Sequence, residues 1–514
     1  MAFHRATWTL RHVCGNPTCQ WPEDALPFYI VDQEIYRFLP SVVVGTLDKA
    51  AMVSMQAAMR GFYASPLGVC DRPGHGYCYS PRSGSPNGCL VPGCRGNRQP
   101  LEQEAKLWAP RLRLQDELHL LRDSLGAVDS HYESIFDHLQ ETLAGKRSKI
   151  IASSATLSGF RRQVDILYRR KARVFPQPGP RLDESFWSEV SATPARRYVA
   201  IAPRGVTLEF VSDRTLTVLQ QCIRDLVENP SDICNKIGIP RAHADHLISQ
   251  YGTNIVYGNT VKDVEARRRS ADTEFPFAVN AEMLIGSTPF EDVRRILDRL
   301  EKPEPEFHDR IQLVAASSTI SHGVDVDRFN SMVMLGLPLT TAEFIQTSAR
   351  VGRRWPGIVY VLHRITRERE VAIYAQFKNF IVQGDRFVEP IPITRASRRV
   401  LALTTPGAEE ARRLAIREPD STTALTMVPR LRDYYRRVGI TADAEEEALV
   451  DALGLQGPLS ELLRQDLHTW ISNYFTALND PATQARWPRE LSPSGPPMIS
   501  LRDVEEGVPV FGED

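Results

Sequence analysis

Two arginines in the second half of the chain could act on a phosphate ester. Arg350 and Arg353 lie three residues apart in the stretch QTSARVGR, which begins at Gln346 and follows an apolar run typical of a buried strand. We expect both arginines at the start of a helix, where they can reach a triphosphate lodged between two domains. An arginine in that place stabilises the charge that develops on the γ-phosphate, an effect of ~10³–10⁵ in rate.

A pair of carboxylates upstream could supply the matching metal and water site. Asp116 and Glu117 end the run LRLQ, which predicts a buried parallel strand with the acids at its carboxyl end, where α/β sheets bind ligands. Asp116 would hold Mg²⁺ directly or through water, and Glu117 would orient and deprotonate the attacking water. Taken alone, these residues are also compatible with a solvated helix face.

Two more segments extend the pattern. The run KIIASSATL from Lys149 predicts a strand followed by small hydroxyl residues, and STISHGVDV from Ser318 follows an apolar strand-like run. Together with the acidic pair and the arginines, these segments resemble motifs II, III, V and VI of superfamily 2 helicases, in that order. The acidic motif is similar to the DEAH-type box, with Leu118 in the third place.

This resemblance implies roles for individual residues. Asp116, Glu117, Arg350 and Arg353 would be catalytic, with one of the two arginines acting as the finger. The residues implied to bind or sense the nucleotide are His119, Gly323, Asp325 and Gln346. The residues implied to touch nucleic acid or to couple it to the nucleotide are His119, Ser154, Thr156 and Thr319.

A further motif of the same kind lies near the amino end of the chain. The segment SVVVGTLDK predicts a strand at Ser41–Val44 and a following helix. Thr46 and Lys49 lie at the turn between them and resemble the helicase motif that presents a threonine hydroxyl and backbone amides to the nucleic-acid backbone. The alternative is an N-cap for a helix at Lys49–Arg60.

One family resemblance is closer than the superfamily. The phrases EIYRFLPSVVVGTLDK, QDELHLL and TTAEFIQTSARVGR are similar to the large helicase of DISARM-type bacterial phage-defence systems, over roughly residues 30–400. The resemblance implies ATP and Mg²⁺ as ligands and a nucleic-acid motor that acts on DNA in antiviral defence. It also implies a partner subunit of the defence system.

The chain departs from this pattern in the phosphate-binding loop. A P-loop of the form G-x-x-x-x-G-K-[ST] wraps backbone N–H groups around the phosphates, and the sequence contains none. We therefore expect the C-terminal part of a longer or split helicase, weak or inactive as an ATPase unless an N-terminal helicase half is supplied. The alternative function is an ATPase-inactive scaffold that binds DNA or partners.

Six of the eight cysteines lie before residue 95. Cys14 and Cys19, and likewise Cys89 and Cys94, form two C-x4-C turns that contain Pro and Gly. Two such turns can direct four sulfurs to one tetrahedral Zn²⁺. Further candidates, in a Gly/Pro/Ser-rich stretch, are Cys70, His75 and Cys78. A structural Zn²⁺ is the interpretation, and reduced thiols without a ligand are the alternative.

Alternating strands and helices predict an α/β fold with tandem RecA-like parallel sheets, of which the first is incomplete. The expected domains are 1–175 with a Cys-rich insertion at about 64–105, a linker at 176–190, a second RecA-like domain at 191–370, and a helical region at 371–514 with a Pro-rich, acidic tail. In the second domain we expect strands at Tyr198–Ala202, Thr253–Tyr257, Ile311–Ala316, Ser331–Leu335 and Gly357–Leu362.

Composition restricts how nucleic acid could be bound. The formal net charge is −1, so binding would depend on local patches and backbone amides and not on a global positive charge. No apolar run approaches the ~18 residues that span a bilayer, and no signal-peptide pattern begins the chain. We expect a cytoplasmic protein without membrane contact.

Overall fold

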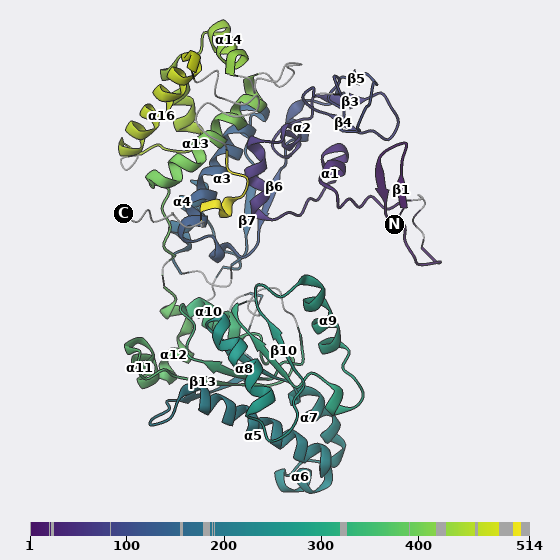
Figure 1. Ribbon diagram of the computed structural model, residues 1–514, viewed down its shortest axis with the longest axis vertical. Coiled ribbons are helices and arrows are strands. Elements are labelled where there is room, and N and C mark those ends of the chain that lie inside the picture. Colours follow the sequence, from purple (N-terminus) through teal and green to yellow (C-terminus); the bar gives the residue numbers. More distant parts are fainter. Residues whose placement is uncertain are drawn as a thin grey trace. The chain divides into compact units, whose positions relative to one another are not determined.

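The computed structural model divides the chain into two compact units (Figure 1). Residues 1–154, 159–172 and 391–514 form the first, and residues 155–158 and 173–390 form the second. The structure describes residues 2–19, 21, 25–82, 84–154, 158–177, 186–187, 189, 191–318, 326–389, 391–417, 428–457, 461–482 and 497–504. Much of the expected linker lies outside these ranges, and the predicted domain boundaries stay predictions.

A six-stranded parallel sheet forms the centre of the second unit, in the order β10-β11-β9-β12-β13-β8. Long βα connections permit this topology, since neighbouring parallel strands need a crossover. The strands are β8 (Arg196–Ile201), β9 (Asn254–Gly258), β10 (Ala281–Leu284), β11 (Leu313–Ala316), β12 (Ser331–Leu335) and β13 (Gly357–Leu362). The five strands expected from the sequence are all present, and β12 and β13 have the predicted bounds.

Helices cover both faces of this sheet. Along β12, Met332 and Met334 pack toward one face, and Val333 and Leu335 pack toward the other, as the two-residue period of a strand requires. The first face carries α9 (Phe290–Glu301), α10 (Thr341–Ser348) and α12 (Phe377–Val382). The second face carries α5 (Leu208–Glu228) and α8 (Val261–Thr273). The predicted α/β class with a doubly wound parallel sheet is confirmed.

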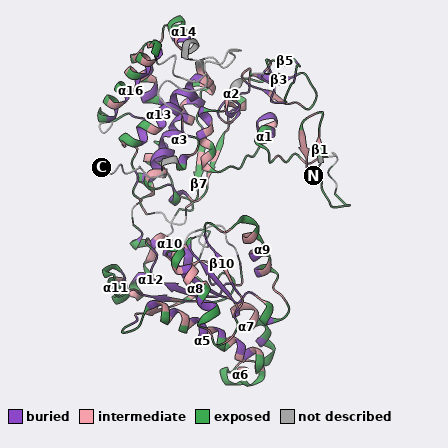
Figure 2. Ribbon diagram, in the orientation of Figure 1, coloured by how far each residue is buried: buried purple, intermediate pink, exposed green. Residues whose placement is uncertain are grey.

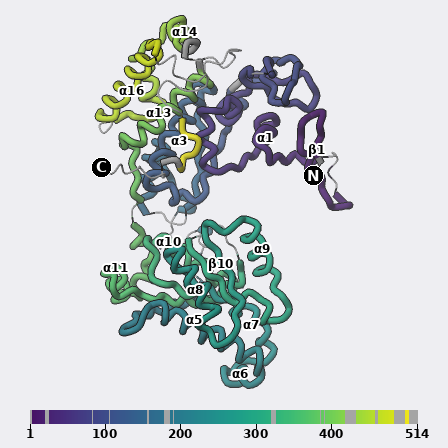
Figure 3. Tube along the Cα trace, viewed as in Figure 1, coloured from purple at the N-terminus to yellow at the C-terminus, as the bar shows by residue number. Residues whose placement is uncertain are grey.

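The first unit is built around the long helix α3 (Asp123–Ala144). Its buried residues pack against α13 (Arg398–Arg412), α15 (Ala442–Ala452) and α16 (Glu461–Asn479), which all come from the far end of the chain. Figure 3 shows these green and yellow C-terminal helices in the same unit as the blue α3. Helices from the C-terminal end of the chain therefore share a core with α3 in the first unit, a grouping that the sequence did not predict.

Two short parallel strands, β6 (Leu112–Gln115) and β7 (Lys149–Ala152), lie against α3. The prediction that β6 is buried is wrong, because Leu112 is 47% exposed and Leu114 is 72% exposed. Figure 2 shows β7 in the colours of exposed and intermediate residues, in contrast to the buried strands of the other unit. Helix α3 covers one face of this small sheet, and Leu112, Leu114 and Ile151 lie exposed on the other.

The expected strand at Ser41–Val44 is absent. These residues are extended but pair with no strand, and Val42 and Val44 are 76% and 90% exposed. The following segment forms 3₁₀ turns at Leu47–Ser54 and Ala57–Phe62 instead of one α-helix. β-Branched residues favour a strand only where a neighbouring strand can pair with them.

The Cys-rich insertion folds as a small module with short strands. Strands β3 (Gly68–Cys70), β4 (Tyr77–Cys78) and β5 (Arg98–Gln99) form an antiparallel sheet in the order β4-β3-β5. An N-terminal hairpin of β1 (Ala2–His4) and β2 (Thr9–Arg11) and the short helix α1 (Asp32–Phe38) complete this end of the chain. Among the described helices, none is long and apolar enough to cross a membrane.

Candidate functional site

The acidic pair lies where β6 ends. Strands β6 and β7 pair in parallel with Gln115 opposite Ala152, and the backbone N–H of Ser153 donates to the carbonyl oxygen of Gln115 at 2.9 Å. The Ser153 hydroxyl donates to Asp116 Oδ1, which also accepts from the backbone N–H of Glu117 at 3.0 Å. The structure therefore joins the acidic motif to the strand that leads into the Ser-Ala-Thr motif.

Glu117 has an unusual backbone conformation. Its φ of 52° and ψ of 48° are left-handed, a region that few non-glycine residues adopt. The turn that follows is held by Gln163 of α4 (Phe160–Tyr168), whose Nε2 donates to the carbonyl oxygens of Leu118 at 2.7 Å and Leu121 at 3.0 Å. His119 is buried, and its Nδ1 lies 3.4 Å from Glu117 Oε2. Strain of this kind, when neighbours fix it, is typical of functional sites.

These groups suit a hard cation. Carboxylate and hydroxyl oxygens are the ligands that Mg²⁺ prefers, and Asp116, Glu117 and Ser153 supply them at one exposed strand end. Ser153 was missed in the sequence. The available signal was its position directly after the β7 run, level with Asp116 if the two strands pair in register.

Partly buried ion pairs hold β6 against α3. Arg113 forms ion pairs with Glu133 at 2.6 Å and with Asp137, both on α3, and Arg170 binds Asp137 at 2.5 Å. Burial disfavours the charged form of Arg113, but the carboxylates of Glu133 and Asp137 outweigh it and raise its pKa. Burial also disfavours the charged form of Glu133, and in this residue it raises the pKa. The network ties the strand that carries Asp116 to the long helix α3.

The arginine motif lies in the second unit, at the other end of the helix from that expected. Helix α10 begins after Thr340, whose hydroxyl accepts the N–H of Glu343 at 3.2 Å, and it ends at Ser348. Arg350 and Arg353 follow in the turn between α10 and β13. The prediction that they start a helix is therefore wrong, although the buried strand before the helix, β12, is where it was expected.

Gly352 fixes the conformation of this turn. Its φ is +74°, and a Cβ added there would lie 2.4 Å from the carbonyl oxygen of Ala195. Its N–H donates to the carbonyl oxygen of Phe329 at 3.0 Å. Arg196 Nε donates to the carbonyl oxygen of Val351 at 2.6 Å. The backbone that carries the arginines is thus held by strand ends on both sides, with Arg350 half-buried and Arg353 exposed.

The remaining predicted residues fall into three groups. Gln346 lies in α10, and Ser154 follows β7 beside the acidic pair. Thr46 and Lys49 lie at the start of the first 3₁₀ turn, where Lys49 Nζ forms an exposed ion pair with Asp32 at 2.5 Å. The predicted residues that lie outside the described part of the chain are Thr156, Thr319, Gly323 and Asp325.

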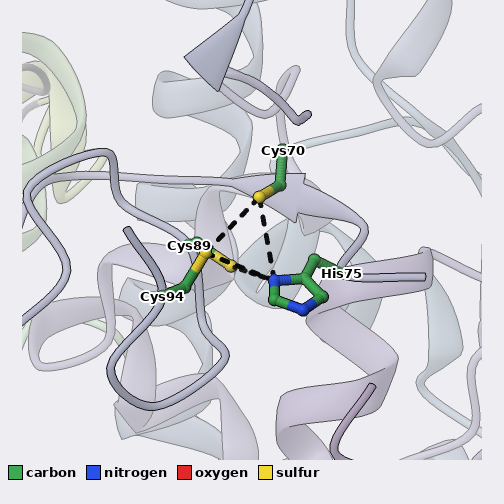
Figure 4. Close-up of side chains that lie close together, drawn as sticks. All are labelled: Cys70, His75, Cys89 and Cys94. Carbon is green, nitrogen blue, oxygen red and sulfur yellow. Dashed lines mark hydrogen bonds between the residues drawn. The ribbon is translucent and has the colours of Figure 1, made fainter. Parts of the chain in front are cut away.

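The structure brings part of the predicted cysteine set together. Cys89 and Cys94 lie beside Cys70 and His75, with all four ligand atoms within 4.8 Å of one another (Figure 4). Cys78 is buried nearby but is not one of the four. Cys14 and Cys19 are exposed in the N-terminal arm and do not join this group.

Comparison with known proteins finds a helicase family model that matches part of the second unit. Residues 240–354 match the family model of the helicase conserved C-terminal domain, a segment that runs from before β9 to the arginine turn. The predicted resemblance to helicases is confirmed. The helicase-like chain is also 27% identical over 405 residues to the DISARM protein DrmA of Bacillus paralicheniformis, which confirms the resemblance to DISARM helicases. That alignment covers 73% of this chain, and it spans about a third (34%) of the length of the relative.

Solved helicase structures are more distant. The DUF1998 helicase MrfA bound to DNA and AMPPNP is 15% identical, with a TM-score of 0.43 over 64% of this chain and 40% of its own. The helicase Lhr of Mycobacterium smegmatis, bound to single-stranded DNA and AMP-PNP, is 13% identical. Its TM-score is 0.41 over 68% of this chain and 37% of its own.

Proposed function

We propose that this chain is part of an ATP-dependent superfamily 2 motor that acts on DNA in bacterial anti-phage defence. The observation that carries the proposal is the Asp116–Ser153 hydrogen bond at the carboxyl end of β6 and β7. It brings the carboxylate pair and Ser153, the residue before the Ser-Ala-Thr motif, to one sheet edge, the edge at which parallel α/β sheets act on ligands. The DISARM relative supports the defence role.

In the first unit, Asp116 and Ser153 would hold Mg²⁺ directly or through water. Glu117 would orient the attacking water and accept its proton, and its fixed left-handed backbone limits the directions its carboxylate can take. His119, 3.4 Å from that carboxylate, would sense its charge and pass the change toward the nucleic-acid contacts. Bound ATP supplies the phosphoryl group, and these residues position water and metal for its transfer.

In the second unit, Arg350 and Arg353 would supply positive charge to nucleotide phosphates. The turn that carries them is fixed by Gly352 and by backbone hydrogen bonds to neighbouring strand ends. Such a preorganised cation stabilises the transition state without the free-energy cost of rearranging at the moment of reaction. The match to the helicase C-terminal domain ends at Arg354 and includes both arginines.

A partner that carries the phosphate loop completes the proposal, because the sequence contains no G-x-x-x-x-G-K-[ST] segment. The partner would be an N-terminal helicase half or another subunit of the defence system. With a formal net charge of −1, the chain would hold the DNA backbone through local basic residues and amides, largely without regard to sequence.

The decisive experiment compares ATP hydrolysis by the chain alone and by its complex with the partner that carries the phosphate loop, with and without DNA. We expect hydrolysis that DNA stimulates in the complex and little in the chain alone. Arg353→Ala should lower the complex rate by ~10³ or more, and Glu117→Gln should lower it strongly while leaving nucleotide binding intact. The matched control Arg354→Ala, an exposed neighbour, should leave the rate unchanged.

A second function is favoured by the same absence of a P-loop motif in the sequence. In that case the chain is an ATPase-inactive scaffold that binds DNA or partner subunits. It would bind DNA equally with and without nucleotide, and Glu117→Gln and Arg353→Ala would change nothing in the complex. That result would overturn the motor function.

A further inference from the structure

We propose that Cys70, His75, Cys89 and Cys94 bind a structural Zn²⁺ that organises the amino-terminal module. The ligand set differs from two C-x4-C turns: one turn contributes both cysteines, and the loop between β3 and β4 contributes a cysteine and a histidine. This inference does not depend on ATP chemistry and holds for a motor or a scaffold.

The distances fit a tetrahedral ion. With Zn–S near 2.3 Å and Zn–N near 2.1 Å, a tetrahedron places two sulfurs about 3.8 Å apart and a sulfur and nitrogen about 3.6 Å apart. The Sγ atoms of Cys70 and Cys94 are 3.6 Å apart. His75 Nδ1 lies 3.8, 3.3 and 3.6 Å from the sulfurs of Cys70, Cys94 and Cys89, respectively. Figure 4 shows the three sulfurs and this nitrogen pointing toward one another.

Groups around the cluster suit bound thiolates. The backbone N–H of Val91 donates to Cys89 Sγ and that of Gly96 donates to Cys94 Sγ, each at 3.4 Å. Asn87 Nδ2 lies 3.9 Å from the sulfurs of both Cys70 and Cys94. Donors of this kind stabilise the charge of metal-bound sulfur and orient the ligands.

The ring of His75 is also held in place by a neighbouring group. A hydrogen bond joins the ring of His75 to the backbone of Ala6. A partner for the rest of the ring fixes which way the ligand nitrogen points.

The module has only a small apolar core of its own, although Tyr79 and Leu90 also pack into the main core of the first unit. The buried cluster in this insertion consists of four cysteines and Val91, and its strands have two or three residues each. A domain too small to bury a sufficient apolar core usually depends on a metal or on disulfides. All the cysteines are free thiols in the structure, so a metal is the cross-link that these contacts support.

The metal loop also holds the N-terminal hairpin through Arg37. This side chain is 1% exposed and donates to the carbonyl oxygens of His75 and Gly74 at 2.7 Å each. It also donates to the carbonyl oxygens of Thr7 at 2.7 Å and Trp8 at 2.9 Å. Zn²⁺ with three thiolates and one neutral imidazole has a net charge of −1, which the buried guanidinium complements. Loss of the metal should therefore release the hairpin as well as the insertion.

The test measures metal in the full chain purified without chelator. We expect one Zn²⁺ per chain by elemental analysis. Replacement by Co²⁺ should give the d–d absorption of a tetrahedral site and a sulfur-to-metal charge-transfer band. Cys70→Ser and Cys94→Ser should lose most of the metal, whereas the controls Cys19→Ser and Cys78→Ser should retain it.

A ligand-exchange variant keeps the proposal testable where a cysteine variant fails to fold. His75→Cys should retain the metal and shift the Co²⁺ bands toward those of four thiolate ligands. Wild-type protein that contains no Zn²⁺ and gives no Co²⁺ spectrum would overturn the proposal. So would metal that is lost on Cys19→Ser and kept on Cys70→Ser, because that result would assign the ion to the exposed arm.

Discussion

The two parallel sheets in the described part of the chain place their strands in opposite environments. In the second unit, β12 is buried on both faces, and Met332, Val333, Met334 and Leu335 are all 0% exposed. In the first unit, β6 and β7 are covered on one face by α3, and Leu114 is 72% exposed on the other. Parallel sheets are usually covered on both faces, so β6 and β7 are the exception.

The difference shows that an apolar strand pattern identifies a strand but not what stabilises it. Apolar burial stabilises β12, whereas hydrogen bonds and the ion pairs of Arg113 with α3 hold β6 in place. The exposed strand is also the one that presents the acidic pair at its end. A strand held by polar contacts can keep its catalytic edge open to ligands.

A matched pair of leucines tests this comparison with the largest expected effect. Leu335→Ala in β12 removes a fully buried side chain and should lower the free energy of unfolding of the second unit by ~2–5 kcal/mol. Leu114→Ala in β6 should change stability by less than about 0.5 kcal/mol, because that side chain already contacts water. Urea unfolding followed by circular dichroism measures both. Equal losses would mean that Leu114 is covered in solution and that the two sheets are alike.

The difference between buried and exposed strands also explains which regions can be predicted from the sequence. The bounds of β12 and β13 are predictable because each is a run of apolar residues that are mostly buried, β12 at every position and β13 at alternate positions. The valines of Ser41–Val44 have the same composition but no strand beside them, so they form none. Pairing depends on distant parts of the chain, which local pattern does not contain.

The candidate sites show the same limit. The identities of the acidic pair and of the arginines follow from spacing, but their place relative to a helix does not. A Thr340-x-x-Glu343 capping pattern marks the true start of α10 and was available in the sequence.

For the metal site, the sequence narrows the candidate zinc ligands to a set of cysteines and one histidine. Only the fold of β3 and β4 selects Cys70 and His75 over the symmetrical pair Cys14 and Cys19.

Each unit contains a buried neutral histidine. The pH dependence of stability can therefore be measured for each unit and compared. Burial lowers the pKa of His131 to about 3, and nearby Arg395 adds to this effect; burial lowers the pKa of His363 to about 4. Nε2 of His131 donates to the carbonyl oxygen of Arg395 at 3.0 Å. His363 packs against the rings of Tyr374 and Phe377. Both residues therefore resist protonation in the folded state.

The sign of the pH effect follows from proton uptake. Below pH ~6.5 the unfolded chain binds a proton at each histidine and the folded chain does not, so stability falls as pH falls. Each residue contributes about 1.4 kcal/mol per pH unit, or roughly 3 kcal/mol between pH 6.5 and pH 4.5. Hydrogen exchange of peptides from each unit measures it. His131→Asn should flatten the pH dependence in the first unit only; an unchanged slope there would mean that His131 is protonated in the folded state.

The smallest expected effect is the difference in stability between alanine variants of two glycines that have left-handed backbones. Gly145 ends α3 at φ +65° with nothing within 4 Å of an added Cβ, so Gly145→Ala should cost only the ~1–2 kcal/mol of left-handed strain. Gly352 has φ +74°, and a Cβ there would lie 2.4 Å from the carbonyl oxygen of Ala195 and 2.9 Å from the backbone nitrogen of Gly357. Those are strand-end backbone atoms that cannot move without disturbing β8 or β13.

Gly352→Ala should therefore lower the free energy of unfolding by ~1–3 kcal/mol more than Gly145→Ala does, as measured by urea unfolding. It should also lower DNA-stimulated hydrolysis in the complex, because Arg350 and Arg353 move with the turn. Equal losses of stability and activity in the two variants would mean that the backbone at Gly352 is no more restrained than the end of α3. The proposal that a rigid turn positions Arg350 and Arg353 would then be wrong.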